Sequence, residues 1–139
     1  MIIADTGFFL ALASRKDRHH TRAKHALARV KEPLITTWPV LTETCHLLSS
    51  RLGATALFAF VESATRGAFQ IFELSPRQLP VMLELMQKYR ALPMDLADAS
   101  LVVLAQEIGT GRILSTDRRD FETYRWKNRK PFQNLLELD

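Results

Sequence analysis

Four carboxylates occupy positions along the chain that suit metal-ion chemistry. Asp5 and Asp117 each end a short stretch that reads as a buried strand, while Glu43 and Asp98 lie on apolar helical faces. Acidic side chains are seldom fully buried unless they are paired or bound to metal. Like charges held close together repel, and a divalent cation removes that conflict. Ligand sets made only of oxygen suit Mg²⁺, Mn²⁺ or Ca²⁺ rather than zinc.

The helical spacing around Asp98 and Glu43 carries much of this prediction. The residues three, four and seven positions after Asp98 are all apolar, namely Leu101, Val102 and Ala105. Such a stripe is expected to face the core, so the Asp98 carboxylate is predicted to lie at the start of a buried helix face. Glu43 has Val40 three residues before it and Leu47 four residues after it. Both acids are therefore predicted to emerge from packed helix faces.

Each acid alone also has an ordinary structural explanation. Asp5 and Asp117 suit turns or helix N-caps. Asp98 suits the first turn of a helix capped by Asp95, and Glu43 suits a solvated helix edge. The set of four favours a metal site, because two strand ends share one rim and the two helix faces can point at it. The predicted chemistry is phosphodiester hydrolysis, in which the ion activates a water and stabilises charge on the reacting oxygens.

Strands and helices are predicted to alternate along the chain. Strands are expected at 2–5, 34–37, 69–74 and 112–116, with an edge strand at 135–138. Helices are expected at 8–14, 21–31, 39–52, 54–66, 76–89 and 97–108. This order predicts an α/β fold, a three-layer α/β/α sandwich with a central, mostly parallel sheet, in a single domain spanning 1–139. Open α/β sheets bind ligands outside the carboxyl ends of their strands, which is where Asp5 and Asp117 fall.

The composition is typical of a globular protein with a basic net charge. The chain has 139 residues, of which 47% are hydrophobic and 24% charged, as in an ordinary globular domain. One cysteine excludes a disulfide framework, and neither a signal peptide nor a membrane-spanning stretch is recognisable, so we expect a cytoplasmic protein. The net charge of +4 favours polyanionic partners such as nucleic acid.

The segment from Arg112 to Lys130 is rich in basic residues. Its candidates for nucleic-acid contacts are Arg112, Arg118, Arg119 and Arg125. Tyr124, Trp126 and Phe132 are interleaved with them. Basic groups can hold phosphates while aromatic rings stack on unpaired bases. The alternative is a solvated C-terminal segment whose aromatic rings pack on the core, and the sequence leaves both open.

Several short motifs, taken in order, resemble the PIN domain family, and especially the VapC-like toxins of bacterial toxin–antitoxin pairs. The resemblance spans residues 1 to about 125. It is carried by the opening Ile3-Ala4-Asp5-Thr6-Gly7, by Asp17-Arg18-His19-His20, by Thr42-Glu43, by Leu96-Ala97-Asp98-Ala99 and by Ser115-Thr116-Asp117-Arg118-Arg119-Asp120-Phe121.

This resemblance implies a metal-dependent ribonuclease that uses one or two Mg²⁺ or Mn²⁺ ions and forms a homodimer. It implies an acidic quartet of catalytic and metal-binding residues, Asp5, Glu43, Asp98 and Asp117. Thr6 and Thr116 resemble supporting hydroxyl residues. Asp95 and Asp120 are extra acids; Asp95 is interpreted as a cap first and a ligand second, and Asp120 as a residue that orders the turn after Asp117. A small antitoxin protein is the implied partner, and RNA the implied substrate.

Two other functions remain open on the same predicted fold. One is a non-catalytic module that binds RNA or protein, which would have no need of clustered carboxylates facing a polyanion. The other is a nuclease directed at DNA, which shares the chemistry and differs in its substrate. Glu43 and His46 form one Glu-x-x-His pair, but a di-iron site needs a second such motif, which the sequence lacks.

Overall fold

The sheet at the centre of the molecule consists of five parallel strands, in the order β3-β2-β1-β4-β7. The computed structural model describes residues 1–136. The strands are β1 (Ile2–Ala4), β2 (Leu34–Thr37), β3 (Gln70–Phe72), β4 (Arg112–Leu114) and β7 (Gln133–Asn134). In the central strand, Ile3 lies opposite Ile35 on one side and Ile113 on the other. These apolar residues are buried because helices cover both faces.

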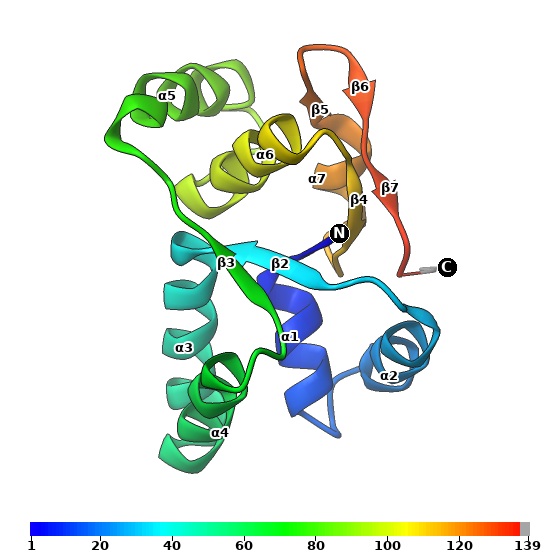
Figure 1. Cartoon of the computed structure of the whole chain (residues 1–139). Helices are drawn as coiled ribbons and strands as arrows, with labels where there is room; N and C mark the ends of the chain where they lie inside the picture. The colour runs from blue at the N-terminus through cyan, green and yellow to red at the C-terminus, as the bar shows by residue number, and fades with distance from the viewer. Residues whose placement is uncertain (137–139) are drawn as a thin grey trace.

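Helices form the two outer layers of the sandwich. They are α1 (Thr6–Ala13), α2 (His20–Arg29), α3 (Trp38–Leu52), α4 (Ala54–Thr65), α5 (Leu79–Lys88) with a preceding 3₁₀ turn (Pro76–Gln78), α6 (Leu96–Ile108) and α7 (Arg118–Thr123). Helices α5 and α6 lie on one side of the sheet, and α1, α2 and α4 lie on the other (Figure 1). The predicted three-layer α/β/α architecture is confirmed. No helix within residues 1–136 is long and apolar enough to cross a lipid bilayer.

The strand order creates a crevice beside β1. From β1 the chain passes through α1 and α2 to β2, which pairs on one side, whereas β4 pairs on the other side. In open parallel sheets such a reversal leaves a crevice at the carboxyl ends of the two central strands, and ligands bind there. Asp5 follows β1, and Asp117 follows β4 by three residues. The fold therefore brings both acids to this crevice.

The last strand of the sheet lies earlier than the sequence predicted. Strand β7 is Gln133–Asn134, whereas 135–138 was expected; Leu135 and Leu136 follow it, and 137 and 138 lie outside the described residues. The prediction followed the apolar residues. The paired segment is polar because it forms one edge of the sheet, where a strand is only partly covered.

The aromatic residues of the basic segment pack into the molecule. Tyr124 and Trp126 are buried, and Phe132 is half-buried against the core. The Trp126 indole donates from Nε1 to the Pro131 carbonyl at 3.0 Å, within the hairpin that β5 (Arg125–Trp126) makes with β6 (Lys130–Pro131). Of the two interpretations that the sequence left open, the structure shows the packing of these rings on the core.

Candidate active site

Asp5 is a buried acid at the crevice. It is 7% exposed and caps α1, where its Oδ1 accepts a hydrogen bond from the Thr6 amide at 2.7 Å. Its Oδ2 accepts a second hydrogen bond, at 2.9 Å, from the Ser115 hydroxyl. Asp is a preferred N-cap because its oxygen satisfies a free amide at the helix start. The carboxylate is thus fixed by hydrogen bonds to both oxygens.

Ser115 connects the two acids that follow strands, a role that sequence reasoning missed. While its hydroxyl donates to Asp5, the same oxygen accepts from the Asp117 amide at 3.0 Å. Asn134 on β7 holds the Ser115 backbone from both sides: its Nδ2 donates to the Ser115 carbonyl at 2.8 Å, and its Oδ1 accepts from the Ser115 amide at 3.2 Å. The signal in the sequence was a serine two residues before an aspartate, a spacing typical of hydroxyl-stabilised turns.

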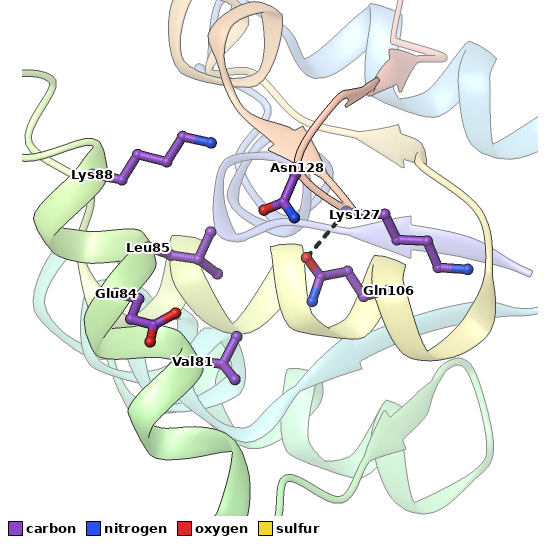
Figure 2. Close-up of a pocket in the computed structure, with 7 residues that line it drawn as sticks. All are labelled: Val81, Glu84, Leu85, Lys88, Gln106, Lys127 and Asn128. Carbon is purple, nitrogen blue, oxygen red and sulfur yellow. Dashed lines mark hydrogen bonds between the residues drawn. The ribbon is translucent and has the colours of Figure 1, made fainter.

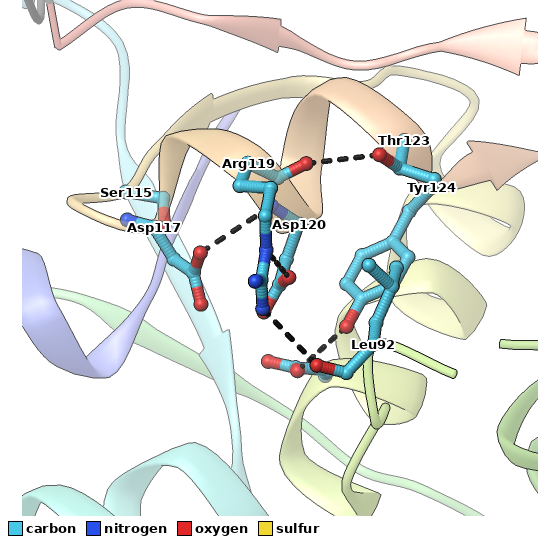
Figure 3. A network of polar contacts seen from close by, with 8 residues as sticks. Leu92, Ser115, Asp117, Arg119, Asp120, Thr123 and Tyr124 are labelled. Atoms are coloured by element: carbon cyan, nitrogen blue, oxygen red, sulfur yellow. Dashed lines mark hydrogen bonds and ion pairs between the residues drawn. The ribbon is translucent and has the colours of Figure 1, made fainter. Parts of the chain in front are cut away.

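Asp117 caps α7, and Arg119 lies beside it. The Asp117 carboxylate accepts from the Asp120 amide at 3.3 Å. Arg119 donates from Nε to Asp120 Oδ1 at 3.3 Å and from an Nη atom to the Leu92 carbonyl at 3.1 Å (Figure 3). Asp120 was expected to order the turn after Asp117. Its amide does take part in that turn, while its buried carboxylate pairs with Arg119.

Helix α1 and the loop after β4 approach each other closely at this rim. A Cβ placed on Gly7 would come within 1.9 Å of the Thr116 hydroxyl oxygen, so only glycine fits there as the atoms stand. The expected supporting role of Thr116 stays a prediction, but its side chain does lie at the contact between these segments.

Asp98 enters the site from the first turn of α6. Asp95 caps this helix by accepting from the Asp98 amide at 2.8 Å, so its interpretation as a cap is confirmed. The Asp98 Oδ2 accepts a hydrogen bond from the Tyr124 hydroxyl at 3.0 Å. Deeper in the same helix, Ser100 and Thr37 share a buried hydrogen bond of 2.6 Å, which ties α6 to the carboxyl end of β2.

Glu43 reaches the rim from α3 and is half-buried. Thr6 hydrogen-bonds to it and lies in contact with α3 through Thr44, whose hydroxyl donates to the Thr6 hydroxyl at 3.3 Å. Thr6 therefore links the helix that begins after Asp5 to the helix that carries Glu43, while its supporting role in the site stays a prediction.

All four predicted acids have a pKa above the usual range for a carboxyl group. Burial raises the pKa of Asp5 to about 6, and the charges of Glu43 and Asp117 add to the rise. Burial, followed by the charges of Asp5 and Asp95, raises the pKa of Asp98 to about 8. The pKa of Asp117 is raised to about 6 by burial and by its contact with Asp120. Burial and the charge of Asp95 raise that of Glu43.

This set of acids, Asp5, Glu43, Asp98 and Asp117, has the chemistry of a divalent-cation site. The atoms available to bind a cation are all carboxylate oxygens. The charges of Asp5 and Asp117 raise the pKa of Asp98, so these three acids lie close enough to interact. Among residues 1–136, no three acidic, histidine or cysteine side chains are already drawn together as a closed ligand group. Mg²⁺ commonly binds through one or two carboxylates and completes its shell with water and substrate phosphate, so these residues fit such an ion.

The four arginines expected to contact nucleic acid are divided between two ends of the sheet. Arg119 lies at the acidic rim, and Arg118 belongs to the same helix, α7. Arg125 begins β5, and the next residue, Trp126, packs against Gly111 just before β4. Arg112 begins β4, at the opposite end of that strand, where it forms an ion pair with Glu32. The structure thus does not bring Arg112 together with the acids.

Two hollows of the surface lie apart from the acidic rim. A pocket of about 540 Å³ between α5, α6 and the β5–β6 hairpin is lined by Glu84, Leu85, Lys88, Gln106, Lys127 and Asn128 (Figure 2). An apolar groove of about 400 Å³ between α1 and α4 is lined by side chains that include Phe9, Leu12, Leu27, Phe60 and Phe69. Neither hollow includes any of the four acids, so size alone does not identify the site.

Comparisons with known proteins agree with this geometry. The profile of the family described as PIN domain matches residues 2–127. Ribonuclease VapC26 of Mycobacterium tuberculosis is 27% identical over 124 residues, which cover 89% of this chain and 92% of that protein.

Two solved structures share the fold. A crystal structure of Mycobacterium tuberculosis VapC20, described as a sarcin-ricin loop cleaving toxin, has a TM-score of 0.79 and 22% identity, covering 84% of this chain and 90% of the other. PAE2754 from Pyrobaculum aerophilum has a TM-score of 0.53 and 20% identity, covering 96% and 88%. Since the family profile spans most of the chain and the acids lie at the crevice of the parallel sheet, this protein belongs to the PIN domain family.

Proposed function

We propose that this protein is a metal-dependent endoribonuclease that hydrolyses RNA phosphodiester bonds at the acidic rim. The observation that carries the proposal is the meeting of Asp5, Asp98 and Asp117, from three separate segments, at the carboxyl ends of β1 and β4. The similarity to a protein named as a ribonuclease supports RNA as the substrate. A pure binding module would gain nothing from placing carboxylates against a polyanion.

The residues of the rim have separate tasks in this proposal. Asp5, Glu43, Asp98 and Asp117 would hold one or two Mg²⁺ or Mn²⁺ ions. When bound, a divalent ion supplies Lewis-acid stabilisation of charge on the attacking and leaving oxygens. Ser115 keeps Asp5 in its orientation through the 2.9 Å hydrogen bond. Arg119, whose side chain is 73% exposed at the rim, is placed to bind a substrate phosphate.

We extend the proposal to a toxin of a toxin–antitoxin pair acting in the cytoplasm, where its RNA substrate is found. A small antitoxin would bind apolar surface of the kind that the groove between α1 and α4 offers. A homodimer would cover leucines that α5 exposes, including Leu79 and Leu83. Co-expression with the product of a neighbouring reading frame tests the first statement, since an antitoxin should copurify and suppress cleavage. Light scattering tests the second, since a dimer has twice the mass of the chain.

The direct test is cleavage of labelled single-stranded RNA by the purified protein with Mg²⁺, with Mn²⁺ or with EDTA. Asp98→Asn is expected to lower the cleavage rate by at least about 100-fold, because it removes a metal ligand and its charge. Glu84→Gln, which neutralises an exposed acid in the pocket of Figure 2, is the matched control and should cleave like the wild type.

The outcomes separate the candidate functions. Cleavage that requires metal and is lost in Asp98→Asn establishes the proposal. Near-normal cleavage by a folded Asp98→Asn protein would refute the assignment of the site. RNA binding that is indifferent to Mg²⁺ and leads to no cleavage would favour the binding module, and cleavage of single-stranded DNA at an equal rate would favour the DNA-directed nuclease.

A further inference from the structure

The buried hydroxyl of Tyr124 contacts an acid of the rim and is not itself one of the proposed metal ligands. Tyr124 follows α7 and is 0% exposed. Its O–H donates to Asp98 Oδ2 at 3.0 Å, across 26 residues of sequence. A buried tyrosine needs a partner for its O–H group. Here the partner is one oxygen of an acid that we assign to the metal site.

The position of this hydroxyl is set by packing. The Tyr124 ring makes edge-on contacts with Tyr89, at a centroid distance of 5.0 Å, and with Phe121, at 5.2 Å. Phe121 in turn packs edge-on against Phe132 at 5.3 Å. A ring enclosed in this way cannot follow Asp98 if the carboxylate turns. The hydrogen bond therefore constrains the carboxylate, and the ring does not adapt to it.

We propose that Tyr124 is a positioning residue for Asp98. By holding Oδ2, it limits rotation of the carboxylate and leaves the other oxygen available for the cation. Hydrogen-bond partners of metal-binding side chains orient their ligands, and their loss typically weakens metal affinity by about 10- to 100-fold. The inference rests on the proposed function, because it concerns the metal site of that nuclease.

The chain contains its own matched control, since it has only two tyrosines, Tyr89 and Tyr124. The Tyr89 hydroxyl accepts from the Arg125 amide at 3.1 Å. Tyr124→Phe and Tyr89→Phe each remove one buried hydroxyl from the same aromatic cluster and keep both rings. The first substitution removes the contact with Asp98, and the second leaves it intact.

The first measurement is Mn²⁺ affinity without RNA, followed by electron paramagnetic resonance of the free ion. Tyr124→Phe is expected to weaken Mn²⁺ binding about 10-fold or more, and Tyr89→Phe to change it by less than about 2-fold. Tyr124→Phe should also raise the Mg²⁺ concentration for half-maximal cleavage more than it lowers the rate at saturating Mg²⁺. Unchanged affinity in Tyr124→Phe, or an equal loss in both variants, would overturn the proposal.

A second measurement uses the wild-type chain and stands even if Tyr124→Phe does not fold. Labelling with ¹³Cζ-tyrosine gives one resonance for each tyrosine, and Tyr89→Phe assigns them. Titration with Mg²⁺ should shift the Tyr124 resonance more than that of Tyr89. A Tyr124 resonance that stays fixed at saturating Mg²⁺ refutes the positioning role alone. A wild-type protein that binds neither Mn²⁺ nor Mg²⁺ refutes the metal site of the proposed function, and this inference with it.

Discussion

Among the three aspartates of the rim, Asp98 has the carboxyl pKa that is raised furthest. Burial, with the charges of Asp5 and Asp95, raises it to about 8, and the hydrogen bond from Tyr124 opposes the rise. A raised pKa means that the folded state binds the proton more tightly than the unfolded chain does. In the metal-free protein, the stabilising contribution of protonated Asp98 is fully present below the ordinary carboxyl pKa of 3.8. It is lost as the pH rises through about 8.

The raised pKa of Asp98 predicts how the stability of the metal-free protein depends on pH. In EDTA, Asp98→Asn should raise the melting temperature at pH 8.5 by several degrees and have a smaller effect at pH 5, because asparagine is never charged. A change of about 1 kcal/mol moves the Tm of a domain of this size by about 3–5 °C. Scanning calorimetry at both pH values measures the difference. Equal shifts at the two values would contradict the ionisation argument.

Some of these residue roles were predictable from sequence and others were not. The cap formed by Asp95 was predictable, since an aspartate three residues before the acid at a helix start is a local pattern. Ser115 was within reach of the same kind of reasoning. The contact of Tyr124 with Asp98 was not, because it depends on how a short helix and hairpin pack against α6. The orientation of the aromatic rings was not predictable either, because a segment of basic and aromatic residues has the same sequence pattern whether its rings face the solvent or the core.

At the scale of elements, the helices and strands that could be predicted are those with a clear periodic pattern of apolar residues. The strands around Ile3, Ile35 and Ile113 and the long helices between them have clear apolar patterns, and the structure contains them. Helix α7 and the β5–β6 hairpin were missed, since their lengths of six and two residues are too short for a pattern to emerge. The confirmed layers, by contrast, follow from the simple alternation of strands and helices.

The approach of α1 to the loop after β4 gives a prediction at this scale. Gly7→Ala would place its Cβ 1.9 Å from the Thr116 hydroxyl oxygen, so the Thr116 side chain and the loop that carries it must shift. Overpacking of this kind costs about 1–3 kcal/mol, and cleavage should fall as Asp5 and Asp117 move apart. Urea denaturation and the cleavage assay measure both effects.

Thr116→Ala in the same chain tests the cause. The Thr116 hydroxyl is then absent, and the next nearest atom to the new methyl group is the Cβ at 3.1 Å. The double variant should regain much of the lost stability. A double variant no more stable than Gly7→Ala alone would show that the strain arises elsewhere.

At the scale of the whole molecule, the net charge of +4 has to be reconciled with an acidic site. The acids are gathered at one edge of the sheet, so positive charge predominates over the rest of the sequence. Such a distribution attracts a polyanion from a distance, while the cations bound by the rim would neutralise the local repulsion. The arginines nearest the rim are then expected to contribute more to RNA binding than the arginines at the other end of the strands.

Salt dependence of RNA binding tests this division, with Asp98→Asn as the background to prevent cleavage. A plot of the logarithm of the RNA affinity against the logarithm of the KCl concentration should be a falling line. Its slope should be about −0.7 for each phosphate that the protein contacts in single-stranded RNA. Arg119→Gln should make the slope shallower by about one contact. Arg112→Gln, whose arginine is paired with Glu32, should change it less. A larger effect of Arg112→Gln would move the RNA path to the opposite end of the sheet.

The hold of Asn134 on the Ser115 backbone also sets an order of assembly during synthesis. Asn134 is translated after Asp5, Glu43, Asp98 and Asp117, so each of these acids leaves the ribosome before the strand that fixes the serine between Asp5 and Asp117. A nascent chain that has not yet exposed Asn134 carries every acid of the rim but lacks this support. The acidic rim therefore gains its full set of supporting hydrogen bonds only after this strand has been translated.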